Sequence, residues 1–205
     1  MKSVIKFIFL LLVVQFSMGQ SNTVPQDYLS IEFHKSRHEA LRTKLPKNTV
    51  AIFFSNPTRN RSNDVDYLYH QNPDFYYLSG YKEPHSVLLI FSEDQIDQSG
   101  LSFNELLFVQ PKNATAEMWN GVRLGVKGAK AKLNIAKVLA NMDFGNSFGK
   151  FVSDKRIFIK PFSEDVRDFN KTNDLFSIIN DFKAIINYDE KHLITPQKSR
   201  IFELI

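Results

Sequence analysis

The residues most able to do chemistry lie in the run from Arg61 to Pro84, RSNDVDYLYHQNPDFYYLSGYKEP. It contains five tyrosines and three aspartates, and it ends with a turn at Ser79-Gly80 and the pair Glu83-Pro84. Buried strands carry few carboxylates, and solvated loops carry few aromatic side chains. The composition therefore predicts an ordered surface that presents polar groups.

No set of side chains in the sequence forms a recognisable metal site. His34 and His38 lie four residues apart, but the surrounding sequence HKSRHE is neither HExxH nor HxxEH. That departure favours a solvated helix face. Asp64 and Asp66 lack the glycine and the closing glutamate of a calcium loop. We therefore assign no metal ligand.

Nucleophilic catalysis has no identifiable centre in the sequence either. Cysteine is absent, and no serine lies in a GxSxG pattern. Ser62, His70, Asp74 and Ser79 are neighbours in sequence, but a Ser-His-Asp triad requires geometry that spacing alone does not supply. We therefore assign no catalytic residue to this chain.

Two blocks of the sequence resemble the aminopeptidase P N-terminal domain of the creatinase and Xaa-Pro aminopeptidase family. The second block is TAEMWNGVRLG, residues 115–125, and it matches the family pattern TxExWxGxRxG. His70 and Val122 depart from the arginines that many members carry, and the resemblance extends over about residues 29–182. The matching residues of the first block are Arg61, Ser62, Asp64, Tyr67, Tyr69, Gln71, Asp74, Phe75, Tyr77, Leu78, Ser79, Gly80, Tyr81, Glu83 and Pro84.

The order of predicted elements indicates an α/β fold with a mixed β-sheet flanked by helices. The resemblance implies the creatinase/aminopeptidase P N-terminal domain type, with the pita-bread catalytic domain absent from this chain. We expect 92–104 to be polar and turn-rich. Apolar periodicity and β-branched runs predict helices at 29–45, 129–142 and 174–186, and strands at 49–54, 74–79, 86–91, 105–109 and 156–161.

The chain divides into three expected segments. Residues 1–19 combine a lysine-bearing start, an apolar run and small residues before Gln20, which predicts a secretory signal peptide. A short uncleaved membrane anchor is the alternative. Residues 20–186 form the domain itself, and 187–205 are expected to begin a linker toward the absent catalytic domain. We expect the protein to be secreted or periplasmic, with no membrane contact after signal cleavage.

The charge and the cysteine content argue against a nucleic-acid-binding protein, a disulfide-stabilised protein and a lipoprotein. The formal net charge of +4 falls to +2 once the two lysines of residues 1–19 are removed. That balance gives no basic face for nucleic acid, so we expect no nucleic-acid partner. The absence of cysteine excludes disulfides and lipidation of the mature N-terminus, so the fold depends on its core.

The resemblance implies hydrolysis of the bond between an N-terminal residue and proline. The family uses two divalent metal ions, usually manganese, held by two Asp, one His and two Glu of the catalytic domain. None of those ligands can be placed on this chain, so we expect this chain itself to bind no cofactor. The implied partners are peptides with proline in second position, the chain's own catalytic domain and further copies of itself in a homo-oligomer.

The resemblance also implies two substrate-binding residues, Trp119 and Asp64. The matching tryptophan reaches a neighbouring subunit's active site and helps to wall its substrate pocket, and Asp64 lines the same cleft. The alternatives are a core anchor for Trp119, which lies in an apparent polar loop, and a turn-forming carboxylate for Asp64. We expect Tyr67, Tyr69, Tyr77 and Tyr81 to be structural, and Arg123 to fix the Trp119 loop through a salt bridge.

The sequence therefore predicts the N-terminal, non-catalytic domain of a secreted Xaa-Pro aminopeptidase that shapes substrate access and oligomer assembly, and that is inactive alone. One alternative is a stand-alone secreted peptide-binding or oligomerisation module without hydrolytic activity. Another is a different activity on the same architecture, such as creatine or X-Pro dipeptide hydrolysis. Metal ligands downstream of Ile205 would distinguish an enzyme from a module.

Overall fold

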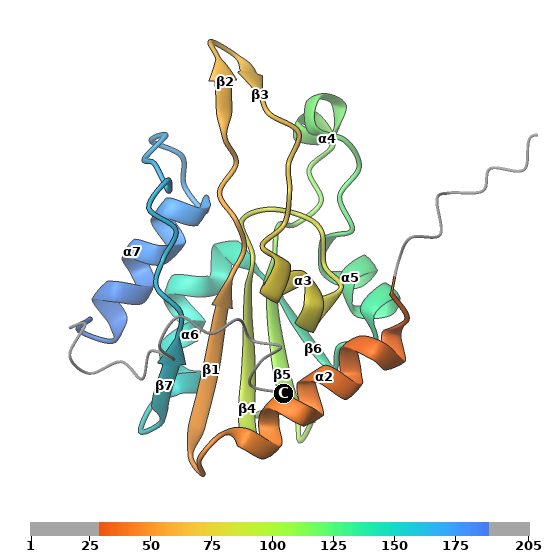
Figure 1. The fold of residues 1–205 in the computed structure, drawn as a ribbon, viewed down its shortest axis with the longest axis vertical. Coiled ribbons are helices and arrows are strands. Elements are labelled where there is room, and N and C mark those ends of the chain that lie inside the picture. The colour runs from red at the N-terminus through yellow and green to blue at the C-terminus, as the bar shows by residue number, and fades with distance from the viewer. Residues whose placement is uncertain (1–28, 189–205) are drawn as a thin grey trace, which may run out of the picture.

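The computed structural model describes residues 29–188 (Figure 1). The predicted signal peptide at 1–19 lies outside the described residues, as does all of the predicted linker except 187 and 188. Within the described part, no helix is long and apolar enough to cross a membrane.

A five-stranded mixed sheet forms the centre of the domain, in the order β6-β5-β4-β1-β7. β4 runs antiparallel to both β1 and β5, whereas the edge strands β6 and β7 run parallel to their neighbours. The β4–β5 ladder shifts register between Ile90 and Gln95. The strands are β1 Thr49–Phe54, β4 Val87–Ile96, β5 Ser102–Val109, β6 Lys137–Ala140 and β7 Arg156–Ile159.

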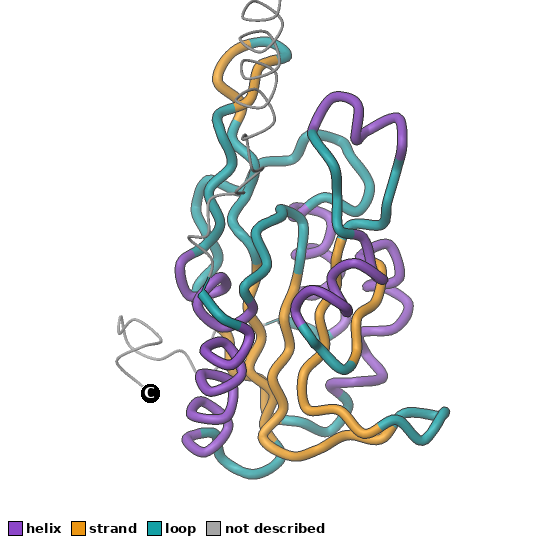
Figure 2. Tube along the Cα trace, turned by 90° about the vertical axis from the view of Figure 1, so that its right-hand side faces the viewer, coloured by secondary structure: helices purple, strands orange, loops and turns teal. Residues whose placement is uncertain are grey.

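Helices cover both faces of the sheet, as the side view shows (Figure 2). Alternate side chains of each strand point to opposite faces, so the apolar runs of β1, β4 and β5 supply two cores at once. Ala51 and Phe53 join the core under α2, α3 and α5, while Val50 and Ile52 join the core under α6 and α7. These helices are α2 Ile31–Lys44, α3 Pro73–Ser79, α5 Gly125–Leu133, α6 Phe144–Val152 and α7 Leu175–Ile185.

Phenylalanines fill the core under α6 and α7. Phe144 contacts Phe108 edge-on with ring centroids 5.0 Å apart, and it stacks on Phe148 at 4.6 Å. Phe148 in turn packs against Phe182 of α7 at 5.5 Å. Such aromatic pairs stabilise a fold by about 0.5–1.5 kcal/mol each beyond their buried area. This cluster replaces the disulfides that the cysteine-free chain cannot form.

The predicted architecture is confirmed, but two predicted elements are wrong. Residues 74–79 form helix α3 and not a strand, because Asn72 caps the amides of Asp74 and Phe75 and Pro73 starts the first turn. The predicted helix at 129–142 ends at Leu133. There Asn134 adopts a left-handed conformation with φ of 53°, and the following residues pair with β5 as strand β6.

The structure also contains elements that the sequence did not predict. Residues 92–104 are largely strand, since β4 continues to Ile96 and β5 begins at Ser102. Helix α4 Ala114–Asn120, helix α6 and the two-stranded ribbon β2 Asn60–Ser62 with β3 Val65–Asp66 were missed as well.

His34 and His38 are buried at the inner face of α2, so the predicted solvated face is wrong. Their exposed fractions are 7% and 4%. The Nδ1 atom of His38 pairs with the Glu105 carboxylate of β5, and Nδ1 of His34 lies 2.9 Å from the Tyr77 carbonyl oxygen. Burial lowers the pKa of His34. The hydrophobicity pattern did not predict that these two positions are buried, because histidine is a polar residue.

Gly80 ends α3 in a conformation that other residues rarely adopt. Its φ is 67°, and a β-carbon at this position would lie 2.8 Å from Cδ2 and Nε2 of the His34 ring. Gly100 has a similar φ of 81°, but a β-carbon there would have no neighbour within 4 Å among the described residues. A substitution at Gly100 therefore introduces backbone strain alone, whereas the same substitution at Gly80 adds a steric conflict with the His34 ring.

We expect Gly80→Ala to destabilise the domain more than Gly100→Ala. Both substitutions cost about 1–2 kcal/mol because a β-carbon disfavours positive φ. Gly80→Ala should cost at least about 1 kcal/mol more, as overpacking against a buried ring does. Urea unfolding of both variants measures the difference, and equal losses would contradict the predicted contact with His34.

His85 connects the start of β4 to the start of α7. Its Nδ1 accepts the Leu175 amide hydrogen at 3.0 Å, and its carbonyl oxygen accepts from Asn141 Nδ2 at 2.9 Å. Burial lowers the pKa of His85 to about 4. The positive charges of Arg123 and Lys171 also lower this pKa, whereas the Asp174 carboxylate raises it. The ring is therefore neutral in the folded domain at pH 7 and serves as an acceptor.

We expect the domain to lose stability as the pH falls through the unfolded-state pKa of histidine toward 4. In the unfolded chain His85 has a pKa near 6.5, whereas in the folded chain its pKa is about 4. Below pH 6.5 the unfolded chain therefore binds more protons than the folded one, and the contribution of His85 to stability is fully present only above that pH. The loss between pH 8 and pH 5 should be about 2 kcal/mol from this group.

His85→Asn is the variant that isolates this group. His85 has a φ of 54°, which asparagine tolerates, and the asparagine amide retains an acceptor. The substitution should therefore remove this part of the loss. Chemical unfolding at both pH values measures it, and an unchanged loss in His85→Asn would assign it to other groups.

Candidate functional site

Two arms project from the same edge of the sheet, where β1 and β5 end (Figure 1). The first arm, residues 57–70, follows β1 and contains the β2–β3 ribbon. The second arm, residues 111–124, follows β5 and contains α4. Because β1 and β5 both run antiparallel to β4, both arms leave the sheet in the same direction.

The first arm is held by polar contacts and not by an apolar core. Its two strands are connected by the turn Asn63-Asp64, in which Asn63 has a φ of 48°. The Asn60 amide donates to the carbonyl oxygens of Asn63 and Val65 at 3.0 and 3.2 Å. Nearer the sheet, Arg59 forms an ion pair with Asp165. The arm therefore keeps its shape while every residue of β2 and β3 stays exposed.

Asp64 lies at the tip of the first arm. Its side chain is exposed, and among residues 29–188 its carboxylate has no hydrogen bond or ion pair. The structure therefore does not support the alternative of a carboxylate that accepts backbone amides in the turn. Asp64 is available for a group outside the domain, and its predicted role in substrate binding stays a prediction.

The second arm carries α4 as a short helix capped at its start. Asn113 Oδ1 accepts the Ala116 amide hydrogen at 3.0 Å, and Glu117 Oε1 accepts the Asn113 amide hydrogen at 3.0 Å. This reciprocal pair satisfies amides that a helix start leaves open. No residue of α4 is buried, so capping and not packing holds the helix.

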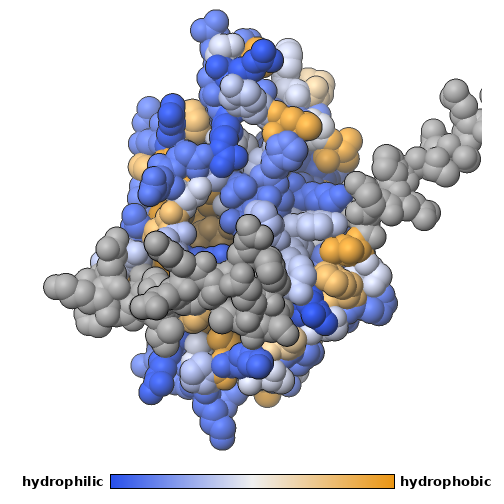
Figure 3. Space-filling view, viewed as in Figure 1, coloured by the Kyte–Doolittle hydropathy of each residue, from blue (hydrophilic) through white to orange (hydrophobic). Residues whose placement is uncertain are grey.

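Trp119 belongs to α4 and is 83% exposed, so the core interpretation is wrong. Met118 and Val122 beside it are 76% and 82% exposed. On the first arm, Leu68 is 83% exposed and Tyr67 is half-exposed. Orange groups interrupt the mostly blue upper end of the molecule, where β3 and α4 lie (Figure 3). An exposed apolar patch of this kind indicates a contact with another molecule.

Trp119 and Asp64 are presented on one edge of the domain but on separate arms (Figure 1). No hydrogen bond joins the two side chains within the described chain.

Gln71 anchors the base of the first arm. Its Oε1 accepts hydrogen bonds from the Asn56 amide, the Asn72 amide and the Tyr69 hydroxyl, at 3.1, 2.8 and 2.9 Å. Its Nε2 donates to the Glu83 carbonyl oxygen at 3.0 Å. One amide side chain therefore joins the outgoing and returning ends of the arm to the loop before β4.

Glu83 extends this connection to the second arm. Its Oε2 accepts from the Tyr81 hydroxyl at 2.7 Å, and its Oε1 accepts from the Leu124 amide at 2.8 Å. Burial raises the pKa of both Tyr69 and Tyr81 well above the usual range, so their hydroxyls remain donors. We call Gln71 and Glu83 the arm anchor, because together they join the bases of both arms.

Among the described residues, Arg123 does not form the predicted salt bridge. Its guanidinium donates to the Pro111 carbonyl oxygen at 3.5 Å, across the base of the second arm. Glu83 takes the role of fixing that arm, through the backbone of Leu124. The tyrosines are structural only in part, because Tyr67 is 58% exposed on the first arm.

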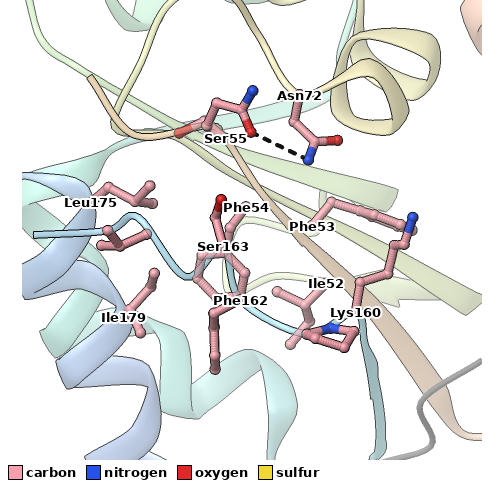
Figure 4. Close-up of a pocket in the computed structure, with 13 residues that line it drawn as sticks. Ile52, Phe53, Phe54, Ser55, Asn72, Lys160, Phe162, Ser163, Leu175 and Ile179 are labelled. Carbon is pink, nitrogen blue, oxygen red and sulfur yellow. Dashed lines mark hydrogen bonds between the residues drawn. The ribbon is translucent and has the colours of Figure 1, made fainter. Parts of the chain in front are cut away.

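A hollow lies away from the arms, between β1, the 160–166 loop and α7 (Figure 4). Its floor is apolar, with Phe162, Leu175 and Ile179, and its upper rim carries Asn72, which is bonded to Asn56 at 3.5 Å. Lys160 turns from the apolar floor to pair with Asp74. The hollow contains no acid-base pair among its described lining residues and suits an apolar side chain.

Two of the four side chains considered above for a triad, Asp74 and Ser79, are engaged elsewhere, and His70 is exposed. Asp74 pairs with Lys160, and the Ser79 hydroxyl donates to the Phe75 carbonyl oxygen at 2.6 Å. Ser62 lies in the exposed ribbon. Within residues 29–188, no group of three or more His, Cys, Asp or Glu side chains could hold a metal ion. No step of a metal-dependent reaction can therefore be assigned to these residues.

Comparison with known proteins gives one family match. The model of the aminopeptidase P N-terminal domain matches residues 34–158. This stretch begins in α2 and ends inside β7, so it contains both arms and all of the sheet except Ile159.

Individual relatives agree with this match. The chain is 36% identical over 109 residues to an Xaa-Pro aminopeptidase of Escherichia coli, covering 53% of this chain and 23% of that protein. It is 36% identical over 110 residues to intermediate cleaving peptidase 55 of Schizosaccharomyces pombe, covering 54% of this chain and 22% of that protein. The chain thus spans about a quarter of these relatives.

Solved structures share the fold. Proline aminopeptidase P II from Yersinia pestis superposes with a TM-score of 0.61 and 27% identity, covering 78% of this chain and 33% of that chain. Aminopeptidase P from E. coli in its low-pH form gives a TM-score of 0.62 over 82% of this chain and 36% of that chain, at 24% identity.

We expect Trp119→Ala to leave the isolated domain stable. An exposed side chain loses little burial, so the cost should be under about 1 kcal/mol. Phe148→Ala, which empties a fully buried position, should cost about 3–5 kcal/mol and serves as the contrast. Denaturant unfolding measures both. Trp119 is the sole tryptophan, so its emission should already resemble free tryptophan in water before unfolding. A large loss of stability, or a blue-shifted emission, would show that Trp119 is buried and would contradict its exposed position.

Proposed function

The chain belongs to the aminopeptidase P N-terminal domain family, and from that membership we propose that it is the non-catalytic N-terminal domain of an Xaa-Pro aminopeptidase. The parent enzyme is a hydrolase that releases the N-terminal residue before a proline. Other aminopeptidases handle this bond poorly, because proline fixes the backbone and lacks an amide hydrogen.

In this proposal the two arms shape access to an active site on another subunit. The observation that carries it is Trp119, a largely solvated aromatic side chain on a capped helix that has no core of its own. A flat indole suits the apolar face of a proline ring. Asp64 supplies a carboxylate at the tip of the other arm, where it can meet the charged end of a peptide.

The remaining parts of the proposal concern assembly, metal and location. The exposed apolar residues on both arms support contact between copies of the protein in an oligomer. Two manganese ions would act in a catalytic domain outside this chain, where they would activate water and stabilise the oxyanion. The pattern in residues 1–19 supports export to the periplasm or outside the cell.

A chimera tests this proposal. Residues 29–188 replace the N-terminal domain of the E. coli Xaa-Pro aminopeptidase, and kcat/KM is measured on a series of Xaa-Pro peptides. We expect an active oligomer in which Trp119→Ala lowers kcat/KM about tenfold, equivalent to about 1.4 kcal/mol of transition-state binding. Residues 1–205 alone should show no turnover.

The matched control is Met118→Ala, the exposed neighbour of Trp119 on the same helix. It should change kcat/KM less than twofold if the indole itself contacts substrate. A chimera that assembles and cleaves peptides equally well with and without Trp119 would refute the substrate role. Turnover by residues 1–205 alone would refute the non-catalytic assignment.

A further inference from the structure

A polar hollow lies at the base of the second arm, on the side that faces the start of α7. Its cavity volume is about 350 Å³. We call it the α4–α7 pocket. Its lining combines the start and end of the second arm with the residues around Asn141 and the loop before α7. The residues used below are His85, Ala116, Asn120, Arg123, Lys171 and Asp174.

Two cations line this pocket without a carboxylate partner among the described residues. Within that part of the chain, Arg123 has one hydrogen bond, to the Pro111 carbonyl oxygen at 3.5 Å. Lys171 lies over the Phe169 ring, 6.0 Å from its centroid, and forms no ion pair with residues 29–188. Arg123 is half-buried and Lys171 is exposed. Two cations that line one hollow without a carboxylate partner indicate a site for an anion.

One carboxylate, Asp174, is also among the lining residues. Its Oδ1 accepts the Ser177 amide hydrogen at 2.9 Å as the cap of α7. The pocket therefore carries a formal charge of +1 from Arg123, Lys171 and Asp174. A monoanion matches this balance, whereas a doubly charged phosphate would meet repulsion from Asp174.

His85 adds a neutral donor to the lining. Its Nδ1 is occupied by the Leu175 amide hydrogen, so the neutral ring carries its hydrogen on Nε2. Arg123 and Lys171 each help to lower the pKa of this buried ring, which places their charges within electrostatic reach of it. The two cations and this donor therefore belong to residues that line the same pocket.

A carboxylate is the monoanion that best fits these groups. Arginine binds a planar carboxylate through two parallel hydrogen bonds, and lysine adds a point charge. The volume of the pocket is much larger than one ion requires and lies at the lower end of the range of pockets that hold small organic ligands. The occupant should therefore carry its carboxylate on a larger body, such as an amino-acid residue.

The position of the pocket relates it to Trp119. Ala116 and Asn120 line the pocket and flank Trp119 on α4, three residues before and one residue after it. A peptide chain lying along α4 can therefore contact the indole and reach the pocket with its end. We propose that the α4–α7 pocket binds the C-terminal carboxylate of a short peptide, with Arg123 and Lys171 as the residues that hold it.

This inference rests on the proposed function for its choice of a peptide, but it adds a specificity. A short peptide with a free C-terminus would be retained, whereas a long or amidated chain would lose the ionic contact. The second arm would then contact the middle of a substrate through Trp119 and bind its C-terminal carboxylate through the pocket.

The test measures binding to residues 1–205 without turnover, by backbone amide NMR. The probes are the tripeptide Ala-Pro-Ala as free acid, the same tripeptide with a C-terminal amide, and acetate. The free acid should shift the signals of Asn120, Lys171 and Asn173 with saturation in the millimolar range, and the amide should bind at least tenfold more weakly. Acetate should bind more weakly than the free acid.

Variants identify the residues that hold the carboxylate. Arg123→Gln and Lys171→Gln should each reduce the preference for the free acid to about twofold or less, with an unchanged Tm. Lys130→Gln removes an equally exposed lysine of α5 outside the pocket and should leave the preference intact. Lys171 lies on an exposed loop, so its variant remains informative if Arg123→Gln fails to fold.

Four results would overturn the inference. These are equal binding of acid and amide, binding of neither, shifts confined to another part of the domain, and acetate binding as tightly as the peptide. Self-association that Arg123→Gln abolishes would assign the cations to an acidic side chain of a second copy instead. A chimera that fails to cleave Xaa-Pro peptides would refute the proposed function without changing these binding results, so the two failures are distinguishable.

Discussion

The carboxylate of Glu83 is the point on which the geometry of the two arms depends. One oxygen holds the Leu124 amide at the end of the second arm, the other holds the Tyr81 hydroxyl, and the Glu83 carbonyl oxygen receives the Gln71 side chain from the first arm. Hydrogen bonds to a charged group are about twice as strong as neutral ones, and leaving one of these donors unpaired inside the protein is costly. The positions of the two arms are therefore coupled through a single residue.

This arrangement explains why an exposed site can be ordered. The arms have almost no core, since α4 and the β2–β3 ribbon bury no residue. Their order comes from caps, from the Asn60 side chain and from the arm anchor beneath them. The sheet below contributes rigidity through two separate apolar cores. Trp119 can then remain in solvent, available to another molecule, without destabilising the domain.

The site on this edge is incomplete within the described residues. Trp119 and Asp64 lie on different arms, and the described residues contain no metal-ligand cluster and no assembled triad. The relatives that share the fold are much longer, and the chain spans about a third of the solved structures and a quarter of the curated proteins. The aromatic, acidic and cationic groups at this end of the domain are the features on which the proposed role in substrate access rests.

The sequence alone determined the central sheet strands and the two blocks that identify the family, whereas tertiary structure decided the roles of individual side chains. The runs of β1, β4 and β5 each contain a largely apolar stretch, and those of β1 and β4 include several β-branched residues, so local composition was enough to predict them. Composition could not show that Lys137–Ala140 forms a strand, because its stability comes from pairing with β5, about thirty residues earlier in the chain. Whether His38 is solvated or buried depends on Glu105, and whether Trp119 is core or surface depends on the arm that carries it away from the sheet. These properties arise from contacts between residues distant in sequence, which local propensity and spacing do not encode.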